Sequence, residues 1–317
     1  MFYNYYLCFL GTAVICLLLE WKYPWRKKVY QSKEYLQDIF FFIFNTYVFS
    51  MILRVVIGPL ESRFTKFEEF LRPYSLFDTF NGLSLLAQII GLLFLKDFLE
   101  YWIHRMLHRI PFLWRYHKLH HTVKEIYWIE NFRFHWMELI VYKSLKYLPL
   151  VFFSFHFGIS WQAVFWVGIL STLIGNLNHT NSKMDYGIFK YLINSPSLHV
   201  WHHDKVNHFK YGQNFGVVLS VWDWMFSTIY YLPDDYPKEL GFVGEEKYPK
   251  KLIKKGLLFL RISLYIFHQV FLGQYIIINT PTRQIMPPIM SYLSGFTLSI
   301  FHPHKIDMTT NTPPYAA

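Results

Sequence analysis

Long apolar segments constrain the fold of this 317-residue chain more than any other feature. A membrane-spanning helix needs about 20 mainly apolar residues. Segments that meet this requirement are 2–20, 36–60, 80–103 and the double-length stretch 138–177, in which 156–160 is expected to form a turn. A further stretch, 256–279, is long enough either to cross a membrane or to lie at its interface. The expected fold is therefore all-α, a polytopic transmembrane helical protein with about four to six spans.

The composition supports one membrane-embedded unit over two soluble domains. Hydrophobic residues make up 53% of the chain, and only 16% of residues are charged, below the roughly 25% usual for soluble domains. The net charge of +10 does not indicate nucleic acid, because the basic residues stand in short clusters beside apolar segments, as in WKYPWRKK (21–28). This pattern favours contact with anionic lipid headgroups and a topology signal.

The N-terminal segment is expected to be a retained anchor, because it lacks the basic start and small-residue cleavage site of a signal peptide. The two cysteines, Cys8 and Cys16, both lie inside it and provide neither a disulfide framework nor a thiolate metal site. Basic clusters follow the first and third apolar segments, which indicates that 21–35, 104–137 and 178–255 face the cytoplasm. The dense histidine motifs then form a cytoplasmic, histidine-rich helical cap.

Histidines are concentrated in motifs of repeated spacing. The pattern His-x-x-His-His occurs twice, as HKLHH (117–121) and HVWHH (199–203). On a helix, residues three and four apart share one face, so each motif is expected to present three imidazoles together. Further histidines lie near both motifs. The predicted metal ligands are His104, His108, His117, His120, His121, His135, His179, His199, His202 and His203.

Packing alone does not explain this concentration, because buried imidazoles lose solvation and repel one another when protonated. Nine or ten nitrogen donors exceed the four of a single zinc site, so two ions are expected. Asp97, Glu100 and Glu138 are candidates to orient a ligand by accepting its other ring N–H, with an ion-paired surface role as the alternative. The more isolated His156, His208 and His268 are expected to be hydrogen-bonded residues rather than ligands.

Imidazole suits zinc, copper, iron and nickel alike, so the ligand type leaves the metal open. The location of the site is more informative. A site at the ends of apolar helices meets a lipid, whose reactive position is an unactivated C–H bond. Zinc has no redox chemistry, whereas iron activates dioxygen for such a step.

Six segments in fixed order carry a resemblance to a known family. They are DFLEYWIHRMLH, RYHKLHH, FRFHWMEL, NHTN, SLHVWHH and YGQNFGVVLSVWDWMFSTIYY. Over roughly residues 85–235 the chain resembles the fatty acid hydroxylase/sterol desaturase superfamily. The resemblance implies an integral membrane non-haem di-iron enzyme that uses O₂ and external electrons to oxidise a lipid, with the ten histidines as ligands. His135 departs from the family pattern, because Trp136 replaces a common proline.

Three regions are expected. The apolar segments predict anchor spans in 1–84, the resemblance implies a di-iron catalytic region in 85–235, and 236–317 is expected to form a C-terminal region with one apolar segment and an irregular tail. Neither a His-Pro-Gly-Gly haem motif nor a GxGxxG loop is present, so a separate cytochrome b5- or ferredoxin-type protein is expected to supply electrons. Two alternatives remain open, a zinc-dependent membrane lipid hydrolase and a metal transporter. No HExxH motif supports the first, and the position of the motifs at span ends disfavours the second.

Overall fold

The computed structural model describes residues 2–27, 33–49, 51, 66, 69, 70 and 82–248 of the chain. The chain divides into two units, Met1–Lys247 and Tyr248–Ala317, and the structure below is that of the first. The expected span 256–279, and His268 within it, lie outside the described residues, as does most of the second half of 36–60.

All the regular elements of the described residues are helices, which confirms the all-α prediction. The longer helices are α1 (Phe2–Lys22), α2 (Lys33–Ile43), α6 (Leu85–Arg109), α8 (Trp136–Phe157) and α9 (Trp161–Asn178). Shorter elements are η1 (Phe44–Val48), α7 (Pro111–His117), η4 (His120–Thr122), η5 (Trp128–Phe132), η6 (Gly187–Tyr191), α10 (Pro196–His202), α11 (Val221–Met225) and η7 (Glu245–Lys247). The part of the chain that the structure describes has isolated β-bridges but no strand. None of its helices combines the length and apolar character needed to cross a membrane.

Local sequence explains where these helices begin and end. The hydroxyls of Ser84 and Ser160 accept hydrogen bonds from backbone N–H groups three residues on, at 3.3 and 3.2 Å, and so cap α6 and α9. Helix α6 ends before Pro111, which becomes the first residue of α7. The turn expected within 138–177 is also present. It lies between α8 and α9, where Gly158 adopts a φ of 69°, a conformation that glycine permits.

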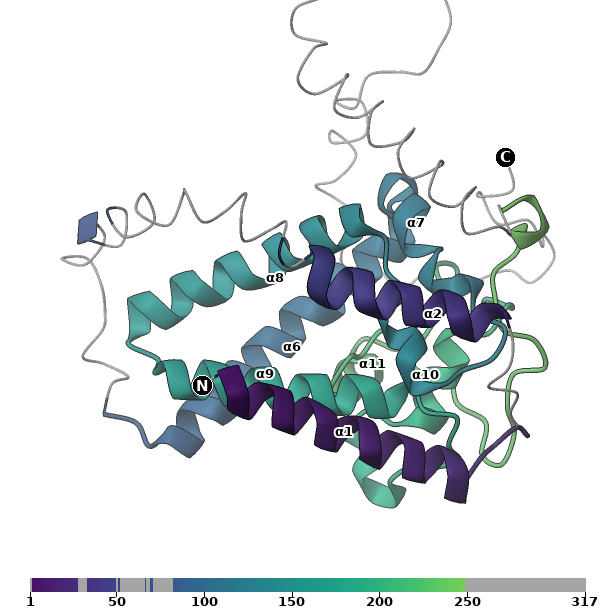
Figure 1. Cartoon of the computed structure of the whole chain (residues 1–317), viewed down its shortest axis with the longest axis horizontal. Coiled ribbons are helices and arrows are strands. Elements are labelled where there is room, and N and C mark those ends of the chain that lie inside the picture. The colour runs from purple at the N-terminus through teal and green to yellow at the C-terminus, as the bar shows by residue number, and fades with distance from the viewer. Residues whose placement is uncertain are drawn as a thin grey trace, which may run out of the picture. The chain divides into compact units, whose positions relative to one another are not determined.

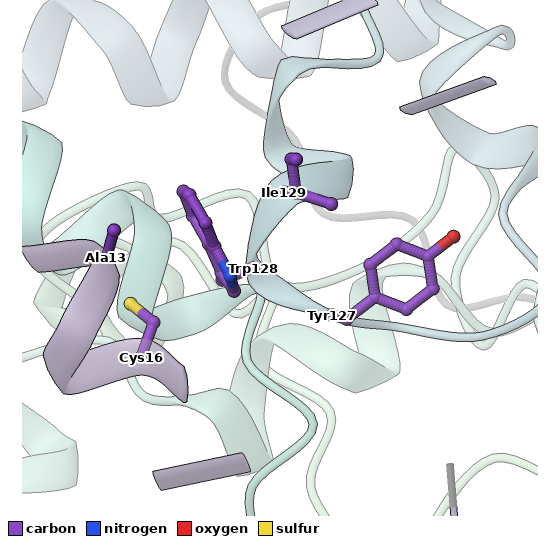
Figure 2. Close-up of a cluster of buried hydrophobic side chains, with 5 residues drawn as sticks. All are labelled: Ala13, Cys16, Tyr127, Trp128 and Ile129. Atoms are coloured by element: carbon purple, nitrogen blue, oxygen red, sulfur yellow. The ribbon is translucent and has the colours of Figure 1, made fainter. Parts of the chain in front are cut away.

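Helix α6 packs against both α8 and α9, and α1 lies along α9 (Figure 1). Leu92, Leu150 and Val167 join α6, α8 and α9 in one buried cluster. Figure 2 shows a second cluster, in which Ala13 and Cys16 of α1 lie near Trp128 of the segment that leads from the first His-x-x-His-His motif to α8. The N-terminal helices therefore support the histidine region directly.

Buried polar contacts strengthen this support. The Glu20 carboxylate of α1 accepts hydrogen bonds from the backbone N–H groups of Trp128, at 2.7 Å, and Asn181, at 3.2 Å. The Asp38 carboxylate of α2 pairs with the guanidinium of Arg133, which is fully buried. These contacts satisfy charges that would be unfavourable if buried alone, and they fix the loop 122–135 against α1 and α2.

Candidate metal centre

Eight of the ten predicted ligand histidines are gathered in two buried groups of four. The first histidine group is His104, His108, His117 and His202, and the second histidine group is His120, His179, His199 and His203. Within each group, one ring nitrogen of every member lies within 4.8 Å of those of the others. Four neighbouring nitrogen donors are the number that a tetrahedral metal site requires.

Each His-x-x-His-His motif is divided between the two groups, which corrects the expectation of one three-imidazole face. Adjacent residues on a helix point roughly 100° apart. In α10, His199 and its i+4 neighbour His203 therefore join the second group, while His202 turns to the first. In the other motif α7 ends at His117 and a 3-10 turn begins at His120. This break in the helix separates His117 from His120.

The first histidine group combines α6, α7 and α10. His104 and His108 lie one turn apart on α6, with ring centroids 5.3 Å apart. The His202 ring lies 4.4 Å from that of His104, and the His117 ring 4.8 Å from that of His108.

The second histidine group is centred on His179, the residue that caps the C-terminal end of α9. Its Nε2 lies 3.0 Å from Nε2 of His199 and 3.2 Å from Nε2 of His120. The ring of His203 lies 4.7 Å from that of His120.

His121 and His135 belong to neither group. Nε2 of His121 lies 3.2 Å from Nε2 of both His108 and His117, so this imidazole is beside the first group. The ring of His135 packs against that of Tyr116, at 4.6 Å, and its Nδ1 accepts a hydrogen bond from the backbone N–H of Met137. Its ligand role stays a prediction.

The histidines expected not to be ligands also lie apart from the groups. Nε2 of His208 is 2.8 Å from a carboxylate oxygen of Asp204, and its ring stacks on Tyr230. His156 stacks on Phe152.

Backbone carbonyls fix the orientation of three of the grouped histidines. Nδ1 of His104 lies 2.9 Å from the carbonyl oxygen of Phe215, and Nδ1 of His202 lies 2.8 Å from that of Gln213. Nδ1 of His179 lies 2.8 Å from the carbonyl oxygen of Gly175. Because a carbonyl only accepts, each Nδ1 carries the proton and each Nε2 lone pair is directed into its group.

The candidate carboxylates act in three different ways. Glu138 Oε1 lies 2.7 Å from Nδ1 of His117, where it can orient that ring. Asp97 does not contact His104, because seven helical residues separate them by roughly 10 Å. Instead it accepts hydrogen bonds from the backbone N–H groups of Val218 and Leu219, close to the carbonyl that orients His104. Glu100 pairs with Lys96 and Lys146 rather than with a histidine.

The electrostatics of the groups suit a metal. Burial lowers the pKa of His104 and His179 to about 4 and that of the other grouped histidines well below the usual range, so the imidazoles are neutral. Nδ1 of His120 and His199, Nε2 of His202 and both ring nitrogens of His203 have no hydrogen-bond partner in the described part of the chain. Unsatisfied buried polar atoms are unfavourable. A metal ion would satisfy Nε2 of His202 and one ring nitrogen of His203, so the donor set fits one.

Sequence reasoning missed Glu130. This carboxylate is fully buried, and its Oε1 lies 3.8 Å from Nε2 of His179. Neither of its oxygens has a hydrogen-bond partner among the described residues, and burial raises its pKa well above the usual value. It lies in a segment of mixed composition with no recognisable spacing to the histidines, so no local signal indicated it.

A cavity of about 490 Å³ adjoins both groups. His104, His117, His120, His179 and His199 form part of its wall. The wall also includes the apolar cluster of Leu92, Leu150 and Val167, and three lysines of α6 and α8. The histidines are thus accessible from a largely apolar space large enough for part of a lipid.

The described part of the chain is a helical fold with two adjacent four-histidine groups suited to metal. The family model described as fatty acid hydroxylase matches residues 89–228, which contain every grouped histidine. Over this region, which is less than half of the chain, the protein is similar to the fatty acid hydroxylase family.

Three relatives illustrate this similarity. An ornithine lipid hydroxylase of Rhizobium tropici is 31% identical over 161 residues, which cover 50% of this chain and 46% of the relative. The alkylglycerol monooxygenase of Homo sapiens is 27% identical and a very-long-chain aldehyde decarbonylase of Oryza sativa subsp. indica is 26% identical. Each of these two matches covers 42% of this chain, and 28% and 22% of the relative, respectively. The chain thus spans less than half the length of these relatives, and no solved structure matches it.

Proposed function

We propose that the protein is an O₂-dependent membrane oxidoreductase that hydroxylates or desaturates a lipid at a C–H bond, using two iron ions held by histidines. The observation that carries the proposal is the pair of buried, neutral four-histidine groups beside a largely apolar cavity. The relatives include an ornithine lipid hydroxylase and an alkylglycerol monooxygenase, which supports a lipid substrate.

Each group would hold one iron, and His121 is a further donor next to the first group. Bound iron supplies the activation of O₂ that oxidation of an unactivated C–H bond requires. The chain's own residues prepare the site. Glu138 and the carbonyls of Phe215, Gln213 and Gly175 keep a proton on Nδ1 of their histidines, so that Nε2 is free to bind a cation.

The cavity would bind and orient the lipid. Its volume of about 490 Å³ is within the range of small-molecule sites, roughly 300–1,000 Å³. Leu92, Leu150 and Val167 give it an apolar wall that excludes water from the reacting carbon.

We further propose that the protein is a multi-pass membrane protein whose metal site faces the cytoplasm. Large apolar side chains exposed on one helix support contact with lipid; on α1 they are Leu7, Leu10, Val14, Ile15, Leu17, Leu18 and Trp21. The family match at 89–228 supports a catalytic region over 85–235. Electrons would come from a separate cytochrome b5- or ferredoxin-type protein.

Metal analysis combined with O₂ uptake tests the proposal. Protein purified without added metal is expected to contain about two iron ions per chain and to consume O₂ when supplied with a reductant and lipid. Stoichiometric zinc with activity that persists without O₂ would contradict the proposal and favour the hydrolase. Metal flux into proteoliposomes, lost in His120→Ala, would favour a transporter.

A further inference from the structure

The wall of the cavity contains charged residues in an otherwise apolar part of two helices. On α6 the residues Leu92, Lys96, Glu100 and His104 follow one another at intervals of four and line the cavity. On α8 the corresponding stripe contains Glu138, Tyr142, Lys146 and Leu150. Ionisable side chains among apolar helices are unfavourable unless they are paired or used to bind a ligand.

Lys96, Glu100 and Lys146 form one buried ionic cluster between the two helices. The Glu100 carboxylate accepts a hydrogen bond from Lys96 through one oxygen, and its other oxygen lies 2.8 Å from Nζ of Lys146. The side chains of Lys96 and Glu100 are almost fully buried, and that of Lys146 is only 13% exposed. Two ammonium groups therefore share one carboxylate, and the cluster carries one more positive charge than negative.

The other residues that line the described part of the cavity do not cancel this excess of positive charge. Lys143 adds a third ammonium group on the same face of α8. The other carboxylate that lines the described part of the cavity is Glu138, which is 2.7 Å from His117. A ligand that brings a negative charge would therefore balance the wall, and charge-assisted contacts to lysine are among the stronger hydrogen bonds.

The position of the cluster sets the dimensions of that ligand. Lys96 precedes His104 by eight residues on α6, and Lys146 follows Glu138 by eight residues on α8. At 1.5 Å per residue, the backbone positions of the two lysines lie roughly 12 Å along their helices from those of His104 and Glu138. Leu92 and Leu150 lie one turn further away. A ligand that contacts all three levels must be extended and must carry apolar segments, which a small inorganic anion lacks.

We infer that Lys96 and Lys146 bind the anionic group, a carboxylate or a phosphate, of an amphiphilic lipid substrate in this cavity. The inference rests on the proposed function, because it names the substrate class of that same site. Glu100 holds the two ammonium groups in position when no ligand is bound and competes with the ligand for them.

Binding of defined amphiphiles to the full-length, metal-loaded protein in neutral detergent tests the inference. Hexadecanoate and hexadecyl phosphate are compared with hexadecan-1-ol, which has the same chain length and no charge, in the absence of reductant so that no turnover is needed. The two anionic probes are expected to bind at least about tenfold more tightly than the alcohol. Equal affinities of the three probes would overturn the inference.

Two substitutions in the same cluster should act in opposite directions. Lys146→Gln is expected to reduce the preference for hexadecanoate over hexadecan-1-ol to less than about threefold. Glu100→Gln removes the competing carboxylate and is expected to increase that preference. Lys190→Gln is the matched control, because Lys190 pairs with Asp185 at 2.9 Å but does not line the cavity. If both cluster variants lose affinity for the alcohol as much as for the acid, the lysines serve only in folding, and the inference is wrong.

The same measurements distinguish a lipid anion from free phosphate, and they distinguish failure of this inference from failure of the proposed function. Inorganic phosphate at millimolar concentration should not displace hexadecanoate, and displacement would indicate a simple anion site instead of a lipid site. If the protein contains iron and consumes O₂ but does not distinguish acid from alcohol, only the inference fails. If the acid is preferred but the metal is zinc and O₂ is not needed, the proposed oxidation fails and the lysine site remains.

Discussion

The two histidine groups have the same number of imidazoles but differ in how those imidazoles are held. In the first group, His104, His117 and His202 each have an Nδ1 partner, supplied by Phe215, Glu138 and Gln213. In the second group, the Nδ1 contact of His179 with Gly175 has no counterpart at His120, His199 or His203 within the described residues. The first group is therefore oriented before any metal binds, whereas the second relies on the metal to order its rings.

Removing one imidazole from either group is the largest change, and it tests whether each group is a separate metal site. We expect His117→Ala and His199→Ala each to remove about one of two metal ions and to lower turnover by more than about a hundredfold, because remaining donors rarely hold the ion in a reactive geometry. Metal analysis and product formation measure both effects. His208→Ala is the control, since His208 pairs with Asp204 outside both groups. Loss of both ions in each variant would mean that the groups form one interdependent site.

Acidification should affect both groups in the metal-free protein, because burial keeps their imidazoles neutral. The pKa of His104 and His179 is about 4 in the folded chain, below the value of about 6.5 in an unfolded chain. The unfolded state therefore binds more protons between these values, and stability falls as the pH falls from about 6.5 towards 4. The loss is up to about 1.4 kcal/mol per pH unit for each such histidine.

Thermal unfolding of metal-free protein between pH 7 and pH 5 measures this loss. The midpoint should decrease steadily on acidification, and bound metal should reduce the decrease, because a coordinated imidazole cannot take up a proton. A midpoint that is independent of pH in the metal-free protein would contradict the neutral, buried state assigned to these rings.

Glu138 distinguishes the two groups directly, because it contacts only His117 of the first. We expect Glu138→Gln to weaken metal binding at the first group by about 10- to 100-fold, as for other partners that orient a metal ligand. The second group should keep its affinity. Stepwise metal titration of the metal-free protein is the measurement. In the unchanged protein we expect the first group to bind its metal ion more tightly than the second. In Glu138→Gln the two affinities should become similar or change order. An equal loss at both steps would show that Glu138 does not act through His117.

The sequence predicts the parts of the site that depend on neighbouring residues of one helix, but not the parts that depend on contacts between distant segments. Helical spacing alone places His104 and His108, four residues apart, on one face of α6, and Pro111 stands where that helix ends. The prediction that each His-x-x-His-His motif presents three imidazoles on one face was wrong. Adjacent residues on a helix point roughly 100° apart, so His202 and His203 must face different directions. That division could have been predicted from the sequence.

Other features could not be predicted, because they depend on contacts across long stretches of chain. No pattern near His104 indicates that the carbonyl of Phe215, more than a hundred residues away, orients its ring. The contacts of Glu20 with Trp128 and of Asp38 with Arg133 likewise bring separate helices to the histidine region. A buried carboxylate such as Glu130 has the same local sequence signal as an exposed one, so only the packed structure distinguishes it.

The smallest expected effect concerns the segment that orients the first group from a distance. Asp97 accepts hydrogen bonds from the backbone N–H groups of Val218 and Leu219, at 2.8 and 2.9 Å, and from the indole N–H of Trp222, at 2.9 Å. An amide at this position accepts through one oxygen only, so Asp97→Asn leaves at least one buried donor without its partner. We expect a loss of about 1–3 kcal/mol in unfolding free energy.

The effect of Asp97→Asn on metal binding is the more informative measurement. Phe215 and Gln213, whose carbonyls contact His104 and His202, lie on the same segment as Val218. Loss of the Asp97 contacts should loosen this segment and weaken the two carbonyl contacts without removing them. Metal affinity at the first group should therefore fall by less than about tenfold. The second group has no partner from residues 213–219 on its ring nitrogens, so its affinity should not change. A matching loss at the second group would mean that Asp97 supports the helical frame as a whole, and the preorganisation assigned to the first group would then not depend on this segment.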